Sequence, residues 1–219
     1  VSGYLDILPD GYGFLRKEMF ISSDNDIYIA PHLIKKFGLY VSDYVKALAK
    51  RTEKDKFPAV NTILEINGLS PQEVANRKDF DLLTPIFPNK KFKLETESHK
   101  YTSRIIDLIA PIGKGQRGVI VSPPKSGKTT IIKDIANSIL LNDFEDKIQL
   151  IILLIDERPE EVTDIAESVN AEVVASTFDE QPQNHVRVAE IVLEKAKRSV
   201  ESGKDVVILM DSITRLSRA

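Results

Sequence analysis

The sequence contains no cysteine and no tryptophan, and only three of its 219 residues are histidine. Without cysteine the chain forms no disulfide, offers no thiolate to a metal and has no thiol nucleophile. The histidines lie far apart in sequence, at positions 32, 99 and 185, which argues against a zinc site. This composition fits a reducing compartment, and we expect a cytoplasmic protein.

Long apolar runs are also missing, so the sequence predicts neither a membrane span nor a signal peptide, and no membrane partner. Apolar residues make up 42% and charged residues 29% of the chain, which excludes wholesale disorder and a collagen-like fibre. The net charge of −3 excludes a globally basic nucleic-acid binder. However, residues 35–56 carry seven basic and three acidic side chains, and a local charge of +4 attracts phosphates unless it is merely a solvated surface.

The first 66 residues consist of short apolar stretches between turn signals, which predict about five strands in a small barrel or sandwich. The expected strands cover residues 4–8, 13–16, 26–30, 44–49 and 59–66, with one short helix over 32–37. Residues 68–103 are polar and interrupted by prolines, so we expect a linker with one helical turn near 71–76. The predicted domains are therefore 1–67, the linker 68–103, and 104–219.

The last part alternates short Ile/Leu/Val runs with longer helical patterns. Strands are expected over 119–121, 150–155, 173–177 and 206–210, and helices over 129–141, 160–169 and 186–202. Continuous apolar strands are buried on both faces, which is typical of a parallel α/β sheet. His185 falls near a helix start, and we assign it no role.

The strongest chemical signal is Ser122–Thr129, which reads SPPKSGKT between an expected strand and an expected helix. In a phosphate loop of this kind, backbone N–H groups and the helix N-terminus face the phosphates, and Gly127 lets the backbone approach them. Lys128 reaches the β- and γ-phosphates, the Thr129 hydroxyl binds Mg²⁺, and Lys125 adds a second positive charge. The alternative is a chance match at a strand-to-helix turn.

Two expected strands end in acids, at Asp156-Glu157-Arg158 and at Asp211. Ligands of open α/β sheets bind at the carboxyl ends of strands, so both acidic ends are expected beside the loop. One acid would hold Mg²⁺ and another would orient the attacking water, but the pattern does not say which. The alternative is that these acids cap the helices that follow.

Near the N-terminus, strand alternation places Tyr12, Phe14 and Arg16 on one face, opposite Leu15. Tyr28 shares a face with Asp26, and Phe57 lies next to the basic stretch. Aromatic rings beside a cation form a platform on which bases stack, whereas the alternative is that these rings fill a small core.

Taken together, these features resemble the Rho-type family of bacterial transcription termination factors. The resemblance covers essentially the whole chain and is carried by residues 10–16, 111–118, 123–129, 154–161, 177–180 and 211–215. It implies an OB-fold (cold-shock-like) barrel followed by a RecA-like phosphate-loop ATPase domain. It further implies a homo-hexameric, ATP-driven RNA translocase and RNA–DNA helicase that acts on the RNA polymerase elongation complex.

By the same resemblance, the barrel would bind single-stranded, pyrimidine-rich and especially cytosine-rich RNA. The implied RNA-binding residues are Gly11, Tyr12, Gly13, Phe14, Leu15, Arg16, Asp26, Ile27, Tyr28, Asp55, Lys56 and Phe57. The family usually has Glu and Tyr where this chain has Asp55 and Phe57, and stacking survives the second change.

In the ATPase domain, the resemblance implies that Glu157 activates the water, that Asp211 and Thr129 hold Mg²⁺, and that Arg158 contacts the nucleotide. Lys128 and Arg158 join Glu157 as the implied catalytic residues. The implied ATP-binding residues are Gly113, Lys114, Gly115, Gln116, Arg117, Gly118, Lys125, Ser126, Gly127, Lys128, Thr129, Thr130 and Arg158.

The family continues beyond both ends of this sequence, so we expect a fragment that lacks an N-terminal helical region and the C-terminal part of the ATPase. Such a fragment would bind RNA but turn over little ATP. Three alternatives stay open: an ATP synthase-type subunit, an RNA-binding module with an idle phosphate loop, and a small-molecule kinase.

Overall fold

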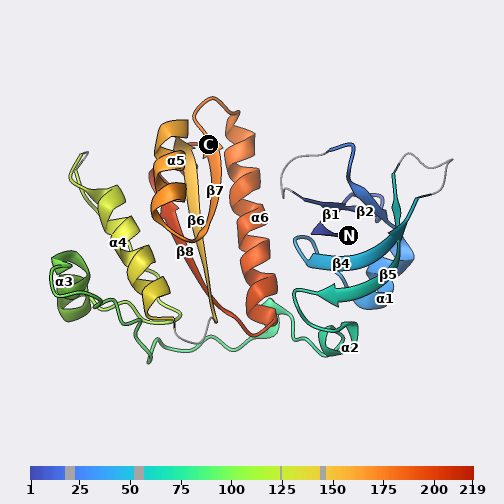
Figure 1. Ribbon diagram of the computed structural model, residues 1–219, viewed down its shortest axis with the longest axis horizontal. Helices are drawn as coiled ribbons and strands as arrows, with labels where there is room; N and C mark the ends of the chain where they lie inside the picture. Colours follow the sequence, from blue (N-terminus) through green and yellow to red (C-terminus); the bar gives the residue numbers. More distant parts are fainter. Residues whose placement is uncertain (18–22, 52–56, 124, 144–146) are drawn as a thin grey trace. The chain divides into compact units, whose positions relative to one another are not determined.

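The computed structural model describes residues 1–17, 23–51, 57–123, 125–143 and 147–219, which form two compact units. The first unit consists of Val1–Leu83 together with Val188–Gly203. The second consists of Thr84–Arg187 and Lys204–Ala219. Figure 1 shows the elements of both units.

The first unit contains a closed five-stranded barrel with the strand order β1-β2-β3-β5-β4. Its strands are β1 (Ser2–Ile7), β2 (Gly13–Arg16), β3 (Ile27–Ile29), β4 (Tyr44–Lys50) and β5 (Ala59–Ile66). All pairings are antiparallel except that of β3 with β5, and β4 closes the barrel against β1. The five predicted strands are confirmed, and the closed OB-like barrel confirms the first half of the predicted fold class.

Alternation along the strands fills the barrel with aliphatic side chains, among them Leu5, Leu15 and Ile29. Helix α1 (Pro31–Phe37) adds Leu33 and Ile34 to this core, and Gly38 ends it in the left-handed conformation, at φ 56°. The one-turn helix α2 (Pro71–Val74) begins at a Ser70–Glu73 capping box, and the short 3₁₀ turn η1 spans Phe80–Leu82.

Beside the barrel, a charged network links its turns to the C-terminal part of helix α6 (Pro182–Glu201). The guanidinium of Arg77 binds both carboxylate oxygens of Asp43, at 2.9 and 3.0 Å. The Glu201 side chain is fully buried, and it accepts from the Phe80 N–H at 2.8 Å and pairs with Arg198 at 3.1 Å. Both guanidinium groups also lie close to the Tyr40 ring, that of Arg77 at 4.7 Å and that of Arg198 at 4.5 Å from the ring centroid.

The second unit is built on a parallel sheet, as the sequence predicts, and its strand order is β7-β6-β8. Its strands are β6 (Ile148–Glu157), β7 (Glu172–Thr177) and β8 (Asp205–Asp211). Helices α3 (Tyr101–Ile109), α4 (Lys128–Leu141), α5 (Pro159–Ser168) and α7 (Ile213–Leu216) also belong to this unit. Figure 1 shows β6 between its two neighbours.

Residues of α4, α5 and β6 form the core of this unit, and Leu150, Ile152 and Leu154 lie in it from one face of β6. Ile151, Leu153 and Ile155 on the other face are buried as well, which explains the unbroken apolar run. Phe92 and Leu94, from the stretch that reads as a linker, are also part of this core.

Two sequence expectations about elements are corrected here. Residues 119–121 form no strand, and Val119 and Val121 are largely exposed. An apolar run becomes a strand only where an edge pairs with it, and in the described part of the chain β8 pairs with β6 alone. In addition, the sequence did not predict helix α3, which begins at Tyr101 within the expected linker 68–103 and continues into the expected domain 104–219.

Among the described residues, no helix combines the length and the apolar character needed to cross a membrane.

Candidate nucleotide and nucleic-acid sites

The phosphate loop leads directly into helix α4, as its sequence predicts. Gly127 is the N-cap residue of α4 and has a φ of 86°, a left-handed conformation that favours glycine. Lys125 also has a positive φ, 59°, and the Ser126 hydroxyl donates to the Pro123 carbonyl at 2.7 Å. The free backbone N–H groups at the start of this 14-residue helix therefore lie at the loop, where an anion binds favourably.

Both predicted acids lie at the carboxyl edge of the sheet. Asp211 is the last residue of β8 and pairs with Leu154 of β6. Glu157 follows Leu154 by three residues on the same strand. The Lys128 ammonium lies 2.5 Å from Asp211 Oδ1, and this carboxylate is almost fully buried. The structure thus brings together the loop lysine and the β8 acid, as expected from strands that run in parallel.

Glu157 is the most perturbed group of the site. Its side chain is buried at the end of β6, and burial is the largest cause that raises the pKa of this carboxyl. A hydrogen bond shared with Glu161 and the charge of Asp211 also raise the pKa, Arg215 lowers it, and the net result is a pKa of about 7. A carboxyl with a pKa close to neutral is suited to take a proton from water near neutral pH.

Arg215 has a place in this site that the sequence analysis did not assign. Its guanidinium lies 3.3 Å from Glu157 Oε2 and also donates to the Asp156 carbonyl oxygen. Asp156 itself has a left-handed backbone, with a φ of 58°. The available signal was the spacing: Arg215 follows Asp211 by four residues, about one helical turn.

The other residues that the sequence predicts for the nucleotide site differ in exposure and position. Thr129 is half-buried in the first turn of α4, whereas Lys125, Thr130 and Arg158 are exposed. Gly113 and Lys114 are not brought to Lys128, because Lys114 pairs with Asp205 at the amino end of β8, opposite the end that carries Asp211. The Gln116 side chain accepts from the Gly113 N–H at 2.8 Å, Gly115 has a φ of 87°, and Arg117 and Gly118 are exposed.

On the barrel, the aromatic residues gather outside the core. The Phe14 ring contacts those of Tyr12, Tyr28 and Phe57, with centroids 5.9, 6.1 and 5.2 Å away, and Tyr12 and Tyr28 are 5.8 Å apart. All four rings are half-buried, and none belongs to the barrel core. Between the two readings of these rings, the structure favours a surface platform over core packing.

Several other residues of the expected RNA site are buried within the barrel unit. Leu15 and Ile27 lie in the barrel core, on the face opposite the rings. Arg16 is buried rather than open to solvent, and it pairs with Asp6 at 2.9 Å and with Asp26 at 3.5 Å. A Cβ on Gly13 would lie 2.6 Å from the Asp6 carbonyl oxygen, so glycine there permits the close approach of β1 and β2.

Two members of that expected site, Asp55 and Lys56, lie outside the described residues. Gly11, by contrast, forms the turn before β2 with a φ of 84°, where glycine is favoured.

The fold and the two sites define a phosphate-loop nucleotide-binding domain that shares its chain with an OB-like barrel. Residues 102–219 match the family described as "ATP synthase alpha/beta family, nucleotide-binding domain". Residues 1–72 match the one described as "Rho termination factor, RNA-binding domain". With both matches in this order, the chain belongs to the family of transcription termination factor Rho.

Curated relatives agree with this assignment along the whole chain. Transcription termination factor Rho of Aquifex aeolicus is 53% identical over 100% of this chain and 51% of its own length. The protein of the same name from Borreliella burgdorferi is 53% identical over 100% of this chain and 42% of its own length. The chain therefore spans about half, or less, of these relatives.

Among solved structures, an ATP synthase subunit of Nanoarcheaum equitans aligns with a TM-score of 0.47 and 22% identity. That alignment covers 65% of this chain and 33% of the other.

Proposed function

We propose that the barrel binds single-stranded, pyrimidine-rich RNA, and that the phosphate loop binds and hydrolyses ATP to drive movement along that RNA. In the whole protein, this cycle would serve a homo-hexamer that acts on the RNA polymerase elongation complex in the cytoplasm and releases transcripts. The single observation that carries the proposal is the cluster of Tyr12, Phe14, Tyr28 and Phe57, whose rings meet outside the barrel core. In OB-fold single-strand sites, each base stacked on an aromatic ring contributes about 1–3 kcal/mol of affinity.

In the nucleotide site, we assign Lys128 to the β- and γ-phosphates and the N–H groups at the start of α4 to the same anion. The Asp211 carboxylate and the Thr129 hydroxyl are hard oxygen donors of the kind that Mg²⁺ prefers, and the bound ion would neutralise charge on the phosphates. Arg158, at the N-cap of α5, remains our candidate for a nucleotide contact.

Glu157 is then the residue that takes the proton of the attacking water. Its pKa of about 7 leaves part of the population ionised at neutral pH, and the contact with Arg215 stabilises that ionised form. Arg215 also fixes the direction of the carboxylate, since the same guanidinium is bound to the Asp156 carbonyl. The roles of Gly113–Gly118 in nucleotide binding stay predictions.

The test of RNA binding is a fluorescence-anisotropy titration with oligo-cytidine and oligo-adenosine at one fixed salt concentration. We expect oligo-cytidine to bind more tightly, and Phe14→Ala to weaken it by about 1–3 kcal/mol, or roughly 5- to 150-fold in Kd. Because Phe14 lies outside the core but packs against three rings, we expect the melting temperature to fall while the barrel stays folded.

Phe80→Ala is the matched control, since it removes an exposed aromatic ring of the same unit that lies outside the cluster. Equal binding by the two variants, or absence of binding by the unmodified chain, would contradict the proposed RNA site.

A further inference from the structure

Five lysines surround one open hollow of about 520 Å³ in the second unit. They are Lys90, Lys91, Lys93, Lys114 and Lys147. Two acids, Asp143 and Asp205, share the lining with them. Apart from Lys114, which the sequence analysis also assigns to the nucleotide, none of these lysines belongs to the proposed nucleotide site or to the aromatic platform.

The lysines are held by a short β-type pairing rather than by a loose loop. The Phe92 N–H donates to the Ile112 carbonyl at 2.8 Å, and the Lys114 N–H donates to the Lys90 carbonyl at 2.7 Å. Phe92 is 8% exposed and Leu94 is fully buried, so the alternating Lys91 and Lys93 face outward. The Asn142 side chain also donates to the Lys93 carbonyl, at 2.8 Å.

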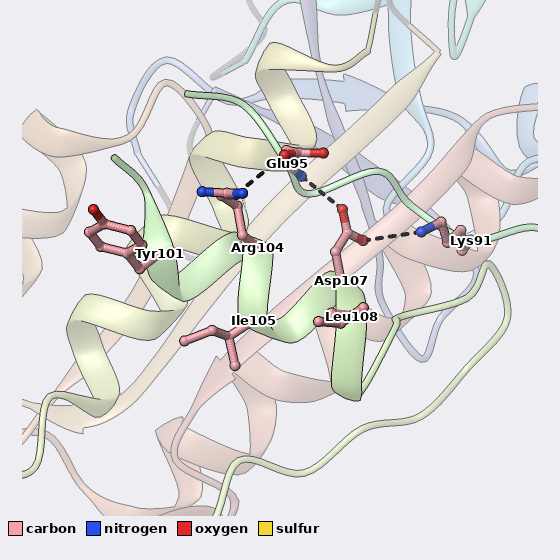
Figure 2. Close-up of a pocket in the computed structure, with 7 residues that line it drawn as sticks. All are labelled: Lys91, Glu95, Tyr101, Arg104, Ile105, Asp107 and Leu108. Atoms are coloured by element: carbon pink, nitrogen blue, oxygen red, sulfur yellow. Dashed lines mark hydrogen bonds and ion pairs between the residues drawn. The ribbon is translucent and has the colours of Figure 1, made fainter. Parts of the chain in front are cut away.

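The acids near the hollow already have partners. Asp107 accepts from the N–H groups of Leu94 and Glu95, both at 2.8 Å, and lies 3.8 Å from the Lys91 ammonium. Figure 2 shows Asp107 between Lys91 and Glu95, with Glu95 also paired to Arg104.

On the other side of the hollow, Asp143 accepts from the Ile148 N–H at 2.7 Å, and Asp205 pairs with Lys114. Within the described ranges, no acid forms an ion pair with Lys90 or Lys93. These two ammonium groups are therefore available to an external anion.

We propose that this lysine hollow binds the phosphate backbone of single-stranded RNA, as a second contact surface on the same chain. Lysine ammonium groups bind phosphates as point charges and carry no base information, so the contact would add affinity without sequence preference. RNA is favoured over a small anion because four of the five lysines are exposed around an open hollow, and the chain carries a family-defined RNA-binding barrel. This inference rests on the RNA binding proposed above.

The hollow is distinct from the phosphate loop. Lys114 pairs with Asp205 at the first residue of β8, whereas Lys128 pairs with Asp211 at its last residue. Six residue steps of a strand separate these ends by about 20 Å. A nucleotide at the loop therefore does not occupy the lysine hollow.

The experiment compares Lys90→Gln/Lys93→Gln with the unmodified chain in anisotropy titrations of a long oligo-cytidine across a salt series. Each phosphate contact on a single strand contributes about 0.7 to the slope of log K against log salt. We expect the double variant to lower that slope by about 1.4. An unchanged slope would overturn the proposal.

Lys78→Gln/Arg187→Gln serves as the control, because it removes two exposed positive charges away from the hollow. Its slope should equal that of the unmodified chain. A loss of slope as large as that of the double variant would show a general charge effect and would also overturn the site.

Two further arms separate the other outcomes. A short oligo-cytidine of about 10 nucleotides, within the roughly 4–16 that one OB fold covers, measures the barrel alone. Its failure to bind overturns the barrel proposal, while the slope with the long oligonucleotide still decides the lysine hollow. Calorimetric titration with inorganic pyrophosphate tests a small anion as the ligand. If pyrophosphate binding depends on Lys90 and Lys93 while the salt slope of RNA binding stays unchanged in the double variant, RNA is rejected as the ligand.

Discussion

At the scale of single residues, Glu157 shows how burial and charge set a site's chemistry. Burial disfavours the ionised carboxylate, and the nearby Asp211 adds to this effect. The Arg215 guanidinium, 3.3 Å away, opposes it. The balance places the pKa at about 7, well above that of a solvated glutamate.

This balance predicts a pH-dependent stability. Because the folded pKa lies above the unfolded value, the folded chain holds the proton more tightly, and the unfolding free energy falls as pH rises from about 4.5 through 7. Glu157→Gln removes this loss, so the unfolding free energy of the variant should exceed that of the unmodified chain by about 3 kcal/mol at pH 8 and match it near pH 4. Urea denaturation followed by circular dichroism at the two pH values measures the difference.

Glu160→Gln provides the matched control, since Glu160 is exposed in the first turn of α5. Its effect should be small and similar at both pH values. A Glu157→Gln effect of the same size at pH 4 and pH 8 would contradict the raised pKa.

At the scale of elements, the C-terminal part of α6 supplies buried charge to the first unit. Glu201 neutralises Arg198 at 3.1 Å and lies 3.7 Å from Arg77, which also pairs with Asp43. The guanidinium groups of Arg77 and Arg198 stack on Tyr40, so each arginine has both an acid and an aromatic partner. Such a network is specific in geometry, and it is costly to break at one member.

Glu201→Ala should therefore destabilise the first unit by about 2–3 kcal/mol, because the Phe80 N–H loses its acceptor and each guanidinium loses one of its two acids. Glu194→Ala removes an acid that is one third exposed and pairs with Lys197 and Arg198, and should cost no more than about 1 kcal/mol. Chemical denaturation of both variants measures the contrast. Equal losses of unfolding free energy in the two variants would mean that the buried Glu201 stabilises the unit no more than the exposed Glu194.

Elements with a strong periodic pattern could be predicted from the sequence. The barrel strands alternate apolar and polar residues, and β6 is apolar on both faces, so both patterns report burial directly. Helix α3 could not be read in this way, because Tyr101, Ile105 and Leu108 are exposed and Lys100 provides no side-chain cap. The run 119–121 failed as a strand because pairing depends on a partner edge, which a local pattern does not contain.

The site residues also divide into those that a local sequence pattern predicts and those that depend on tertiary contacts. Lys128, Asp211 and Glu157 were predictable because the loop motif and the strand ends fix their places. The contacts of Arg215 depend on the direction in which α7 leaves β8, and the pairing of Arg16 with Asp6 depends on the register of β1 and β2. Both are tertiary facts, so the sequence predicted neither an arginine on Glu157 nor a buried Arg16.

At the scale of the whole molecule, two separate hydrophobic cores predict two unfolding transitions. A short oligo-cytidine of about 10 nucleotides, which one OB fold covers, should raise only the transition of the barrel unit. ATP with Mg²⁺ should raise only that of the sheet unit, and each ligand should add about 2.7 kcal/mol at 100 times its Kd. Differential scanning calorimetry with each ligand alone makes the assignment. A single transition, or one that both ligands shift, would contradict independent cores.

The composition of the first unit has a consequence for synthesis on the ribosome. The apolar cluster inside its barrel comes from residues before Leu83, but its buried acid Glu201 is made much later. Translation from Thr84 to Gly203 covers 120 residues, which takes about 6–24 s at roughly 5–20 residues per second. During that interval the nascent barrel can collapse, but Arg77 has Asp43 and lacks Glu201. The emerging chain thus passes through a closed barrel whose charge network is completed only when the end of α6 arrives.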